Sequence, residues 1–328
     1  MSPSIATIIL NYRSASLAIR AVEAALKATE HLERAPIFLI DNESGDGSLE
    51  RLEEAKTERG WPERVQLRAS GRNGGYGFGN NVGFRLGLTE DPPPDYFYIL
   101  NPDCFPDPDA VDELLDFFKR HPRAGLVGSA ARGEDGRPHC TAFRFPSVQS
   151  EFEDGVKLGL ITKLLAPYRV PLGEELEESI VDWVGGMSVL IRRELIEEIG
   201  FFDEGFFLYF EETDLCKRAR AAGFEVGYAK RSRVVHIGSA TTGVQAKDTP
   251  MPSFWYDSRR RYFEKNHGVA YRALADLARV LGEGAFRARV QALGLDRPSK
   301  PRFIRDFIRH QLRSEANLIM KKLGQAPI

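Results

Sequence analysis

IATIILNYRSASLAIRAVEAALKATEHLERAPIFLID, residues 5–41, contains a short apolar run, a helical pattern and a second apolar run that ends in a carboxylate. The apolar runs at 5–10 and 35–41 are typical of buried strands, and the spacing over 15–26 predicts an amphipathic helix. Strands that alternate with helices form a mostly parallel sheet that is covered on both faces. This stretch therefore predicts an α/β fold with a Rossmann-like sheet flanked by helices.

The alternation of strand-like and helical patterns continues to about residue 130 and then stops. Further strand-like runs lie at 64–69, 96–100 and 124–130, and further helical patterns at 46–56 and 109–121. Residues 252–323 are mostly helical in pattern and rich in arginine. We predict an α/β domain over 1–250, with halves 1–130 and 131–250, followed by a C-terminal helical region over 251–328.

The composition indicates a chain with a sizeable core and no strong overall charge. Its 328 residues are 42% hydrophobic and carry a formal net charge of −2, so no nucleic-acid partner is expected. Cys104, Cys140 and Cys216 are scattered, which is typical of reduced thiols. The N-terminus has no basic region, and no apolar run is long enough to span a bilayer. We expect a soluble cytoplasmic protein, with peripheral contact at the inner face of the cell membrane left open.

Polar residues follow several of the predicted strands. Ligands of open α/β sheets bind beyond the carboxyl ends of the strands, which directs attention to Asn11, Asp41, Arg72 and Asp103. In ILNPDCFPDPDA (99–110) a strand stops at Asn101-Pro102-Asp103, because proline ends the pairing and fixes the turn. Asp103 there suits one ligand position on a divalent ion, with a substrate diphosphate supplying others. Alternatively, it caps the helix that follows.

The stretch GRNGGYGFGNNVGF (71–84) is rich in glycine and asparagine and precedes or opens a helix. Glycine allows close backbone approach, and free N–H groups at a helix start can hold a phosphate. The stretch lacks the spacing of a P-loop or of a dinucleotide fingerprint. It therefore indicates either a ligand loop or tight packing.

In LYFEETDLCKRARAAG (208–223) three carboxylates stand at the start of a predicted helix. If the helix begins near Glu211, then Glu212 shares a buried face with Leu215 and Cys216. Glu211 and Asp214 would lie on other sides, with Asp214 paired to Arg218 on the exposed side. A carboxylate that is partly desolvated and faces a cleft suits a general base, so Glu212 is either a candidate for that role or a buried carboxylate without one.

Two further motifs are weaker on their own. In RVVHIGSATTG (233–243) His236 ends a strand-like run and is either a ligand for Mn²⁺ or a similar ion or a core histidine. In DWVGGMSVL (182–190) Gly185 and Gly186 lie inside a strand-like run. They indicate either close approach by another molecule or a β-bulge.

Taken in order over residues 5–265, these motifs resemble the bacterial family 2 glycosyltransferases of GT-A fold, and specifically their rhamnosyltransferase-like branch. The resemblance implies inverting transfer of a sugar from a nucleoside-diphosphate sugar to a hydroxyl of a glycan or lipid-linked acceptor in surface-polysaccharide synthesis. It favours dTDP-L-rhamnose as donor, with a UDP-hexose next. It also makes 1–130 the nucleotide-binding half and 131–250 the acceptor and catalytic half.

The resemblance also assigns roles to individual positions. Glu212 matches the catalytic base, with Glu211 as the alternative, while Asp103 and His236 match ligands of Mn²⁺ or Mg²⁺. Asn101 stands where the family's D-x-D motif has its first acid, a departure that leaves the cation one carboxylate. The residues expected at the donor are Asn11, Asp41, Arg72, Asn73, Asn80, Asn101 and Asp103, with Asp41 at the nucleotide base. Those expected along the sugar and acceptor are Trp183, Gly185, Gly186 and Asp214.

Several alternatives stay open at this point. The chain could instead be a non-catalytic nucleotide-sugar or carbohydrate-binding protein of the same fold, or a sugar nucleotidyltransferase. In the C-terminal region, Arg259–Arg261 lie among aromatic residues, and an apolar stripe runs along 301–313. The stripe includes Phe303, Phe307 and Leu312, and the helix that carries it is basic. This helix would either lie on an anionic membrane or pack against the domain or a second subunit of a homodimer.

Overall fold

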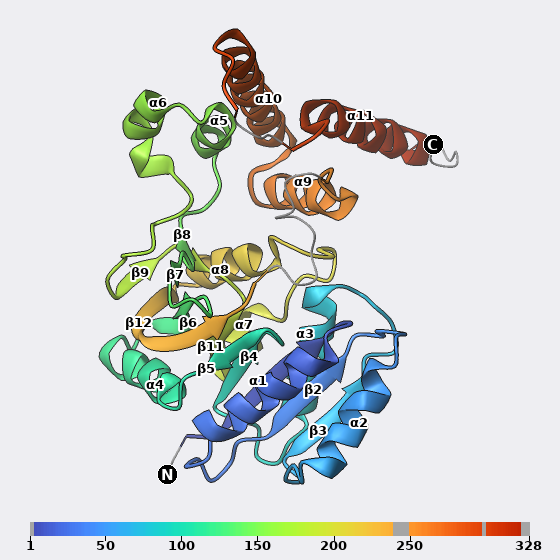
Figure 1. Cartoon of the computed structure of the whole chain (residues 1–328), viewed down its shortest axis with the longest axis vertical. Helices are drawn as coiled ribbons and strands as arrows, with labels where there is room; N and C mark the ends of the chain where they lie inside the picture. Colours follow the sequence, from blue (N-terminus) through green and yellow to red (C-terminus); the bar gives the residue numbers. More distant parts are fainter. Residues whose placement is uncertain (1–2, 239–248, 297–299, 323–328) are drawn as a thin grey trace. The chain divides into compact units, whose positions relative to one another are not determined.

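The structure, a computed structural model, describes residues 3–238, 249–296 and 300–322 (Figure 1). These residues form two compact units. One, here called the catalytic unit, comprises 3–145 and 170–238, and the other, the helical unit, comprises 146–169 and 249–322. The α/β fold with C-terminal helices that the sequence predicts is confirmed.

The catalytic unit is built on a ten-stranded mixed sheet, counted over the described residues. Its path runs β3 (Val65–Ala69), β2 (Ile37–Asp41), β1 (Ile5–Asn11), β4 (Tyr96–Leu100), β11 (Ser188–Arg192), β6 (Ala124–Arg132), β12 (Glu225–His236) and β5 (Cys104–Pro106). The first four strands are parallel, whereas β11 is antiparallel to both of its neighbours. Two short strands, β7 (Pro138–His139) and β9 (Ser179–Val181), join at β6 and β12, and β8 (Ala142–Phe143) pairs with β10 (Trp183–Val184).

Helices cover both faces of this sheet, as the alternating pattern requires. Side chains of β1 alternate between two cores, with Ile5 and Ile9 in one and Ile8 and Leu10 in the other. On the first face lie α1 (Ala15–Ala28), α2 (Ser48–Glu58) and α4 (Ala110–Arg120). On the second lie α3 (Tyr76–Leu88), α7 (Arg193–Ile199) and α8 (Glu211–Ala221). The second face carries the glycine-rich stretch and the two adjacent glutamates.

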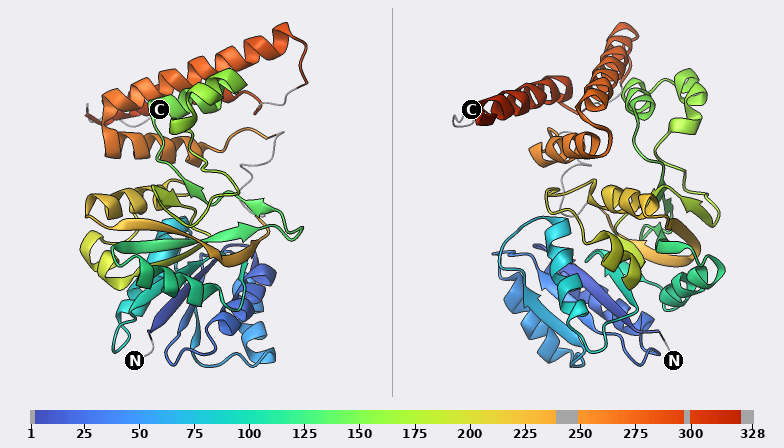
Figure 2. Two further views of the ribbon diagram at one scale, coloured as in Figure 1. Left: turned by 90° about the vertical axis from the view of Figure 1, so that its left-hand side faces the viewer. Right: turned by 180° about the vertical axis from the view of Figure 1, so that it is seen from behind.

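The helical unit contains α5 (Val148–Val156), α6 (Gly159–Leu164), a short 3₁₀ turn (Ala166–Tyr168), α9 (Ser253–His267), α10 (Val269–Ala292) and α11 (Phe303–Lys322). In Figure 2, α5 lies along α10. Where they cross, Gly155 meets the backbone of α10 and Gly282 meets the backbone of α5. The sequence placed a single boundary near residue 250, whereas 146–169 groups with the C-terminal helices because of this crossing.

Buried ion pairs link the helices of this unit. Arg259 is fully buried, with its Nη2 3.0 Å from the Glu151 carboxylate of α5, and it also pairs with Asp276 of α10. Arg272 of α10 pairs with Asp276 and with Glu315 of α11. Each guanidinium is thus neutralised inside the unit, which is the condition under which a charge can be buried.

The apolar stripe predicted over 301–313 divides between the interior and the surface. Phe303 and Phe307 are buried against Tyr256 of α9, whereas Ile308 and Leu312 are 41% and 66% exposed. Packing therefore accounts for the aromatic part of the stripe only. Across the described ranges, no helix has both the length and the apolar composition needed to cross a membrane.

The glycine crossing predicts a specific sensitivity. A Cβ at Gly282 would lie 2.6 Å from the Phe152 carbonyl oxygen, so G282A must push α5 and α10 apart. We expect G282A to lower the free energy of unfolding by about 2 kcal/mol. The control G284A lies on the same helix with nothing within 4 Å and should raise it by about 0.5–1 kcal/mol. Equal effects of the two substitutions in urea unfolding would contradict the crossing.

Candidate active site

Asn11 and Asp41 lie side by side at the carboxyl ends of β1 and β2, because they are register partners of the two parallel strands. Asn11 Nδ2 donates to Asp41 Oδ1 at 2.7 Å, and the Ser44 hydroxyl donates to the same oxygen at 2.6 Å. Asp41 Oδ2 accepts only the Ser44 backbone N–H among the described residues, so it keeps a lone pair for a ligand. Arg13, which sequence analysis missed, donates from Nε to the Ser44 carbonyl.

The glycine-rich stretch is held against the chain segment that leads into α8. A Cβ at Gly75 would lie 1.9 Å from the Phe207 carbonyl oxygen, and the Tyr76 N–H donates to that oxygen at 2.9 Å. Asn73 Oδ1 accepts from the Gly75 N–H, and the Arg72 guanidinium lies over the Phe78 ring at 4.2 Å. Tight packing, one of the two interpretations of this stretch, is therefore confirmed, and Gly75 cannot be replaced by a residue with a side chain.

Two buried amide oxygens in this region have no hydrogen-bond partner among the described residues. Asn80 donates from Nδ2 to the Tyr76 carbonyl, but its Oδ1 is unpaired, and so is Oδ1 of Asn101. The backbone N–H of Asn101 donates to the Met187 carbonyl, which fixes the end of β4 beside β11. A buried acceptor without a donor is costly, so both side chains are suited to receive a ligand donor or to face a cation.

Asp103 and His236 come together because β5 and β12 pair antiparallel, with Cys104 opposite His236. The Asp103 Oδ2 and His236 Nε2 atoms lie 3.5 Å apart, and both side chains are partly buried. One ion bound at about 2.1 Å from each atom fits this separation. Carboxylate oxygen and imidazole nitrogen together suit Mn²⁺ and related ions.

Cys104 completes a group of three possible ligand atoms that lie within 4.8 Å of one another, and sequence analysis missed it. Its thiol is fully buried, and burial raises its pKa well above the ordinary value, with the Asp103 charge adding to the effect. Because a metal binds the thiolate, the neutral thiol leaves Asp103 and His236 as the better ligands. The only available signal was its position next to Asp103.

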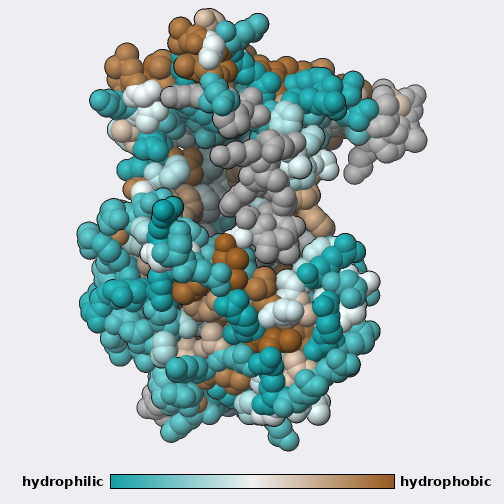
Figure 3. All heavy atoms as spheres, viewed as in Figure 1, coloured by the Kyte–Doolittle hydropathy of each residue, from teal (hydrophilic) through white to brown (hydrophobic). Residues whose placement is uncertain are grey.

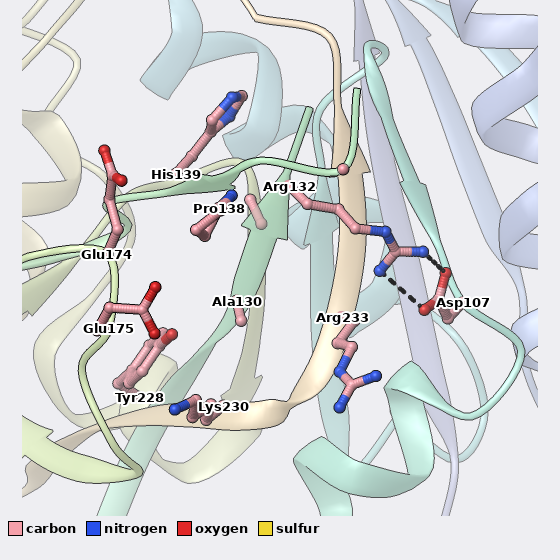
Figure 4. A pocket seen from close by; sticks show the side chains of 12 residues that line it. Asp107, Ala130, Arg132, Pro138, His139, Glu174, Glu175, Tyr228, Lys230 and Arg233 are labelled. Atoms are coloured by element: carbon pink, nitrogen blue, oxygen red, sulfur yellow. Dashed lines mark hydrogen bonds and ion pairs between the residues drawn. The ribbon is translucent and has the colours of Figure 1, made fainter. Parts of the chain in front are cut away.

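A cavity of about 360 Å³ lies beside this group, between β6, β7, β12 and the segment at 174–175 (Figure 4). Its lining includes Arg132, which pairs with Asp107 at 2.7 Å, and Lys230 and Arg233. The His139 ring lines the cavity and meets the His236 ring edge-on, with ring centroids 6.1 Å apart. The cavity therefore adjoins the candidate metal ligands, although it contains none of the predicted catalytic residues.

Glu211 and Glu212 begin α8 directly after two residues in left-handed backbone conformation. Tyr209 and Phe210 have φ values of 70° and 69°, which residues other than glycine rarely adopt. Glu211 is 3% exposed, whereas Glu212 is only partly buried. The sequence correctly placed Leu215 on the buried face but exchanged the two glutamates. The helical pattern could not show that α3 and the preceding segment cover this end of α8.

The pKa values of the two carboxyls are both raised. Burial and the neighbouring Glu212 charge raise the pKa of Glu211 well above its ordinary value, and burial raises the pKa of Glu212 to about 7. The Oε2 atom of each has no hydrogen-bond partner in the described part of the chain. Near neutral pH Glu211 thus holds a proton, while Glu212 is able to accept one.

Tyr76 connects this pair to the glycine pair at 185–186. Its hydroxyl donates to the Gly186 carbonyl at 2.6 Å, and burial with the charges of Glu212 and Glu211 raises its pKa. A Cβ at Gly186 would lie 2.8 Å from that hydroxyl. The glycines lie in the link between β10 and β11, not inside a strand, and at Gly186 the close approach is made by a side chain of this chain.

The other predicted lining residues have defined partners. Trp183 stacks on Phe143 with ring centroids 4.2 Å apart and donates from Nε1 to the Arg144 carbonyl. Asp214 pairs with Arg218 at 2.9 Å, as expected, but its side chain is fully buried rather than on the exposed side. Arg218 also donates to the Ile199 and Phe201 carbonyls, which anchors α8.

The catalytic unit, a mostly parallel sheet flanked by helices on both faces, has the arrangement of the GT-A fold. The solved structure of the mannosyltransferase PcManGT from Pyrobaculum calidifontis, in complex with GDP-Man and Mn²⁺, has a similar fold. The TM-score is 0.58 at 13% identity, over 90% of this chain and 76% of that chain. At this identity the likeness shows the fold alone.

The model of glycosyl transferase family 2 matches residues 4–200, so the chain belongs to that family. It is 33% identical over 222 residues to the N-acetylglucosaminyl-diphospho-decaprenol L-rhamnosyltransferase of Mycobacterium tuberculosis, covering 63% of this chain and 68% of that protein. It is 28% identical over 167 residues to the rhamnosyltransferase WbbL of Escherichia coli K12, covering 50% and 61%. The rhamnosyltransferase-like resemblance is confirmed.

The raised pKa of Glu212 predicts how stability depends on pH. The folded chain holds the Glu212 proton more tightly than the unfolded chain, so the linked stability is full below about pH 4.5 and is lost as the pH rises through about 7. The glutamine of E212Q cannot ionise, so this variant should not lose stability over that pH range. Allowing for partial exposure, we expect its advantage over wild type in urea unfolding to be about 2 kcal/mol larger at pH 8 than at pH 4.5.

The control for this measurement is E198Q, at an exposed position of α7. If E212Q and E198Q change the pH dependence of unfolding equally, the burial of the Glu212 carboxyl is not its cause.

Proposed function

We propose that this chain transfers a sugar, with inversion, from a nucleoside-diphosphate sugar to a hydroxyl of a glycan or lipid-linked acceptor in surface-polysaccharide synthesis. The donor favoured is dTDP-L-rhamnose, with a UDP-hexose next. Support comes from the rhamnosyltransferase relatives, one of which is named for a decaprenol-linked diphosphate acceptor. The observation that carries the proposal is the Glu211–Glu212 pair, held beside the glycine-rich loop by the Gly75–Phe207 contact.

The donor nucleotide would lie along the carboxyl ends of β1, β2 and β4. Asp41, oriented by Asn11 and Ser44, would accept a hydrogen bond from the base through its free lone pair. The unpaired Oδ1 atoms of Asn80 and Asn101 would accept further donors. Arg72 and Asn73, in the glycine-rich loop that precedes α3, would complete the nucleotide pocket.

Asp103 and His236 would hold a divalent cation, Mn²⁺ or Mg²⁺, with the donor diphosphate. Their 3.5 Å separation and mixed oxygen and nitrogen donors fit such an ion. When bound, the cation offsets the negative charge that develops on the departing diphosphate. The single carboxylate of this pair, with Asn101 in place of a second acid, predicts modest affinity in the absence of nucleotide.

Glu212 is the group best suited to deprotonate the acceptor. As the acceptor oxygen forms its bond to the anomeric carbon, its proton passes to the Glu212 carboxylate, and the bond from that carbon to the diphosphate oxygen breaks. One displacement from the opposite face inverts the anomeric centre. Glu211 is deeply buried and retains its own proton, so it cannot serve as the base while Glu212 is present.

Membership of glycosyltransferase family 2 weighs against the two other functions considered. A sugar nucleotidyltransferase would need a triphosphate loop after the first strand, where this chain has NYRSASLA at 11–18. A binding protein without turnover would not need an unpaired carboxylate of raised pKa. We further propose a cytoplasmic location, because the three cysteines are free thiols.

Donor binding is tested by thermal unfolding of the full chain with dTDP, UDP, GDP and their sugars, with and without Mn²⁺ or Mg²⁺. A ligand at about 100 times its Kd adds roughly 2.7 kcal/mol, which raises Tm by several degrees. We expect a metal-dependent rise for one nucleotide that D103A abolishes. D109A, which removes an exposed acid directly before α4, is the control. If no diphosphate raises Tm, the donor assignment fails, and the triphosphates should then be tested.

The base assignment is tested by E212Q and E211Q. We expect E212Q to reduce transfer by about 10²- to 10⁴-fold while the donor-induced rise in Tm persists, because only the proton acceptor is lost. E211Q keeps a neutral group at a site that is already protonated and should cost less than about tenfold. Transfer rates at saturating donor decide between them, and an equal loss in both variants would assign the reaction to the pair.

A further inference from the structure

The longest helix of the helical unit, α10, exposes its apolar side and buries its charged side, the reverse of an ordinary surface helix. Its exposed residues are all uncharged, and all but Gln291 are apolar. Leu274, Leu277 and Leu281, spaced along one side, are 56%, 55% and 56% exposed. A helix of a water-soluble domain normally turns such a stripe toward the core.

The charged residues of α10 point inward instead. Arg272 is 6% exposed and Glu283 is 3% exposed. Asp276 forms ion pairs with both Arg272 and the buried Arg259. Arg279 lies against Glu151 and Asp154 of α5. Because these ion pairs hold the helix in this rotation, the outward position of the leucines is a fixed property of the fold.

The exposed apolar surface is concentrated in this unit. Of the sixteen large apolar side chains that are exposed among the described residues, fourteen lie in the helical unit. They include Leu160 and Leu164 of α6, which are 75% and 74% exposed. Figure 3 shows apolar side chains gathered along the upper edge of the helical unit, over α6, α10 and α11. We call Leu160, Leu164, Leu274, Leu277 and Leu281 the leucine face.

The same unit is strongly basic, although the whole chain is nearly neutral. Residues 146–169 and 242–328 contain 20 Lys and Arg against 11 Asp and Glu, a net charge of +9, so the rest of the chain carries −11. Many of the acids are used in the internal ion pairs. Lys163, Arg309 and Arg313 are exposed and form no ion pair with the described part of the chain.

We propose that the leucine face docks the protein, without spanning it, on the surface of a lipid bilayer that contains anionic lipids. Apolar side chains in the headgroup region and surrounding cations attracted to anionic lipids together give this kind of binding. A second copy of the chain fits less well, because a face-to-face pair would oppose two units of +9. The proposal rests on the proposed function only in that a lipid-linked acceptor resides in such a bilayer.

The test is co-sedimentation of the full chain with vesicles of phosphatidylcholine alone and with vesicles of a one-to-two mixture of phosphatidylglycerol and phosphatidylcholine. We expect wild type to bind the mixed vesicles at least about tenfold more tightly, with the difference shrinking as salt is added. L274Q/L277Q/L281Q should lose at least about tenfold in that affinity. I180Q changes an exposed apolar residue of the catalytic unit and should bind as wild type does.

Unchanged thermal unfolding and an unchanged donor-induced rise in Tm in the triple variant would show that it folds and keeps its nucleotide site. The proposal is wrong if wild type ignores both vesicle types or if the triple variant binds them equally well. It is also wrong if light scattering shows a wild-type dimer that the triple variant loses, since a second copy would then cover the face. Loss of donor binding with intact vesicle binding would overturn the transferase function alone.

Discussion

The candidate active site depends on one backbone contact, the approach of Gly75 to the Phe207 carbonyl. The glycine-rich loop leads directly into α3, and Phe207 lies shortly before α8, so this contact joins the start of one helix to the approach of another. A methyl group at Gly75 would overlap that carbonyl, and the Tyr76 N–H completes the junction. The Tyr76 hydroxyl then donates to the carbonyl of Gly186, in the link between β10 and β11. The glycine-rich loop, the segment leading to the carboxyl pair and the glycine pair at 185–186 therefore meet around a single residue without a side chain.

This junction also explains why the two glutamates differ. Tyr209 and Phe210 must adopt left-handed backbone conformations to bring the chain from Phe207 into α8, which costs of order 1–3 kcal/mol per residue. The turn carries Glu211 inside and leaves Glu212 at the edge. Two carboxyls of the same chemistry thus receive different environments: burial and the Glu212 charge raise the pKa of Glu211 well above its ordinary value, and burial raises the pKa of Glu212 to about 7. Separating the pKa values of adjacent acids in this way is a general means of assigning catalytic roles.

The sequence could predict whatever follows from strand order and residue type. Asn11 and Asp41 end adjacent parallel strands, so their contact was foreseeable, and Asp103 lies where a proline stops β4. His236 meets Asp103 only because β12 returns antiparallel to β5, and no local pattern specifies that pairing. The same limit applies to Glu211, Cys104 and Asp214, whose burial depends on segments distant in the chain. Helical periodicity gives the faces of an element but not what covers them.

The helical unit is assembled from two stretches of chain that are far apart in the sequence. Glu151 and Asp154 of α5 bond to arginines 108 and 125 residues further on. During synthesis α5 emerges first, and its ion-pair partners and the backbone that its Gly155 packs against do not yet exist. The unit can close only after Arg279 has been made, when the strands of the catalytic unit are already available to pair. Any function of the leucine face must therefore wait until synthesis has passed well beyond the sheet.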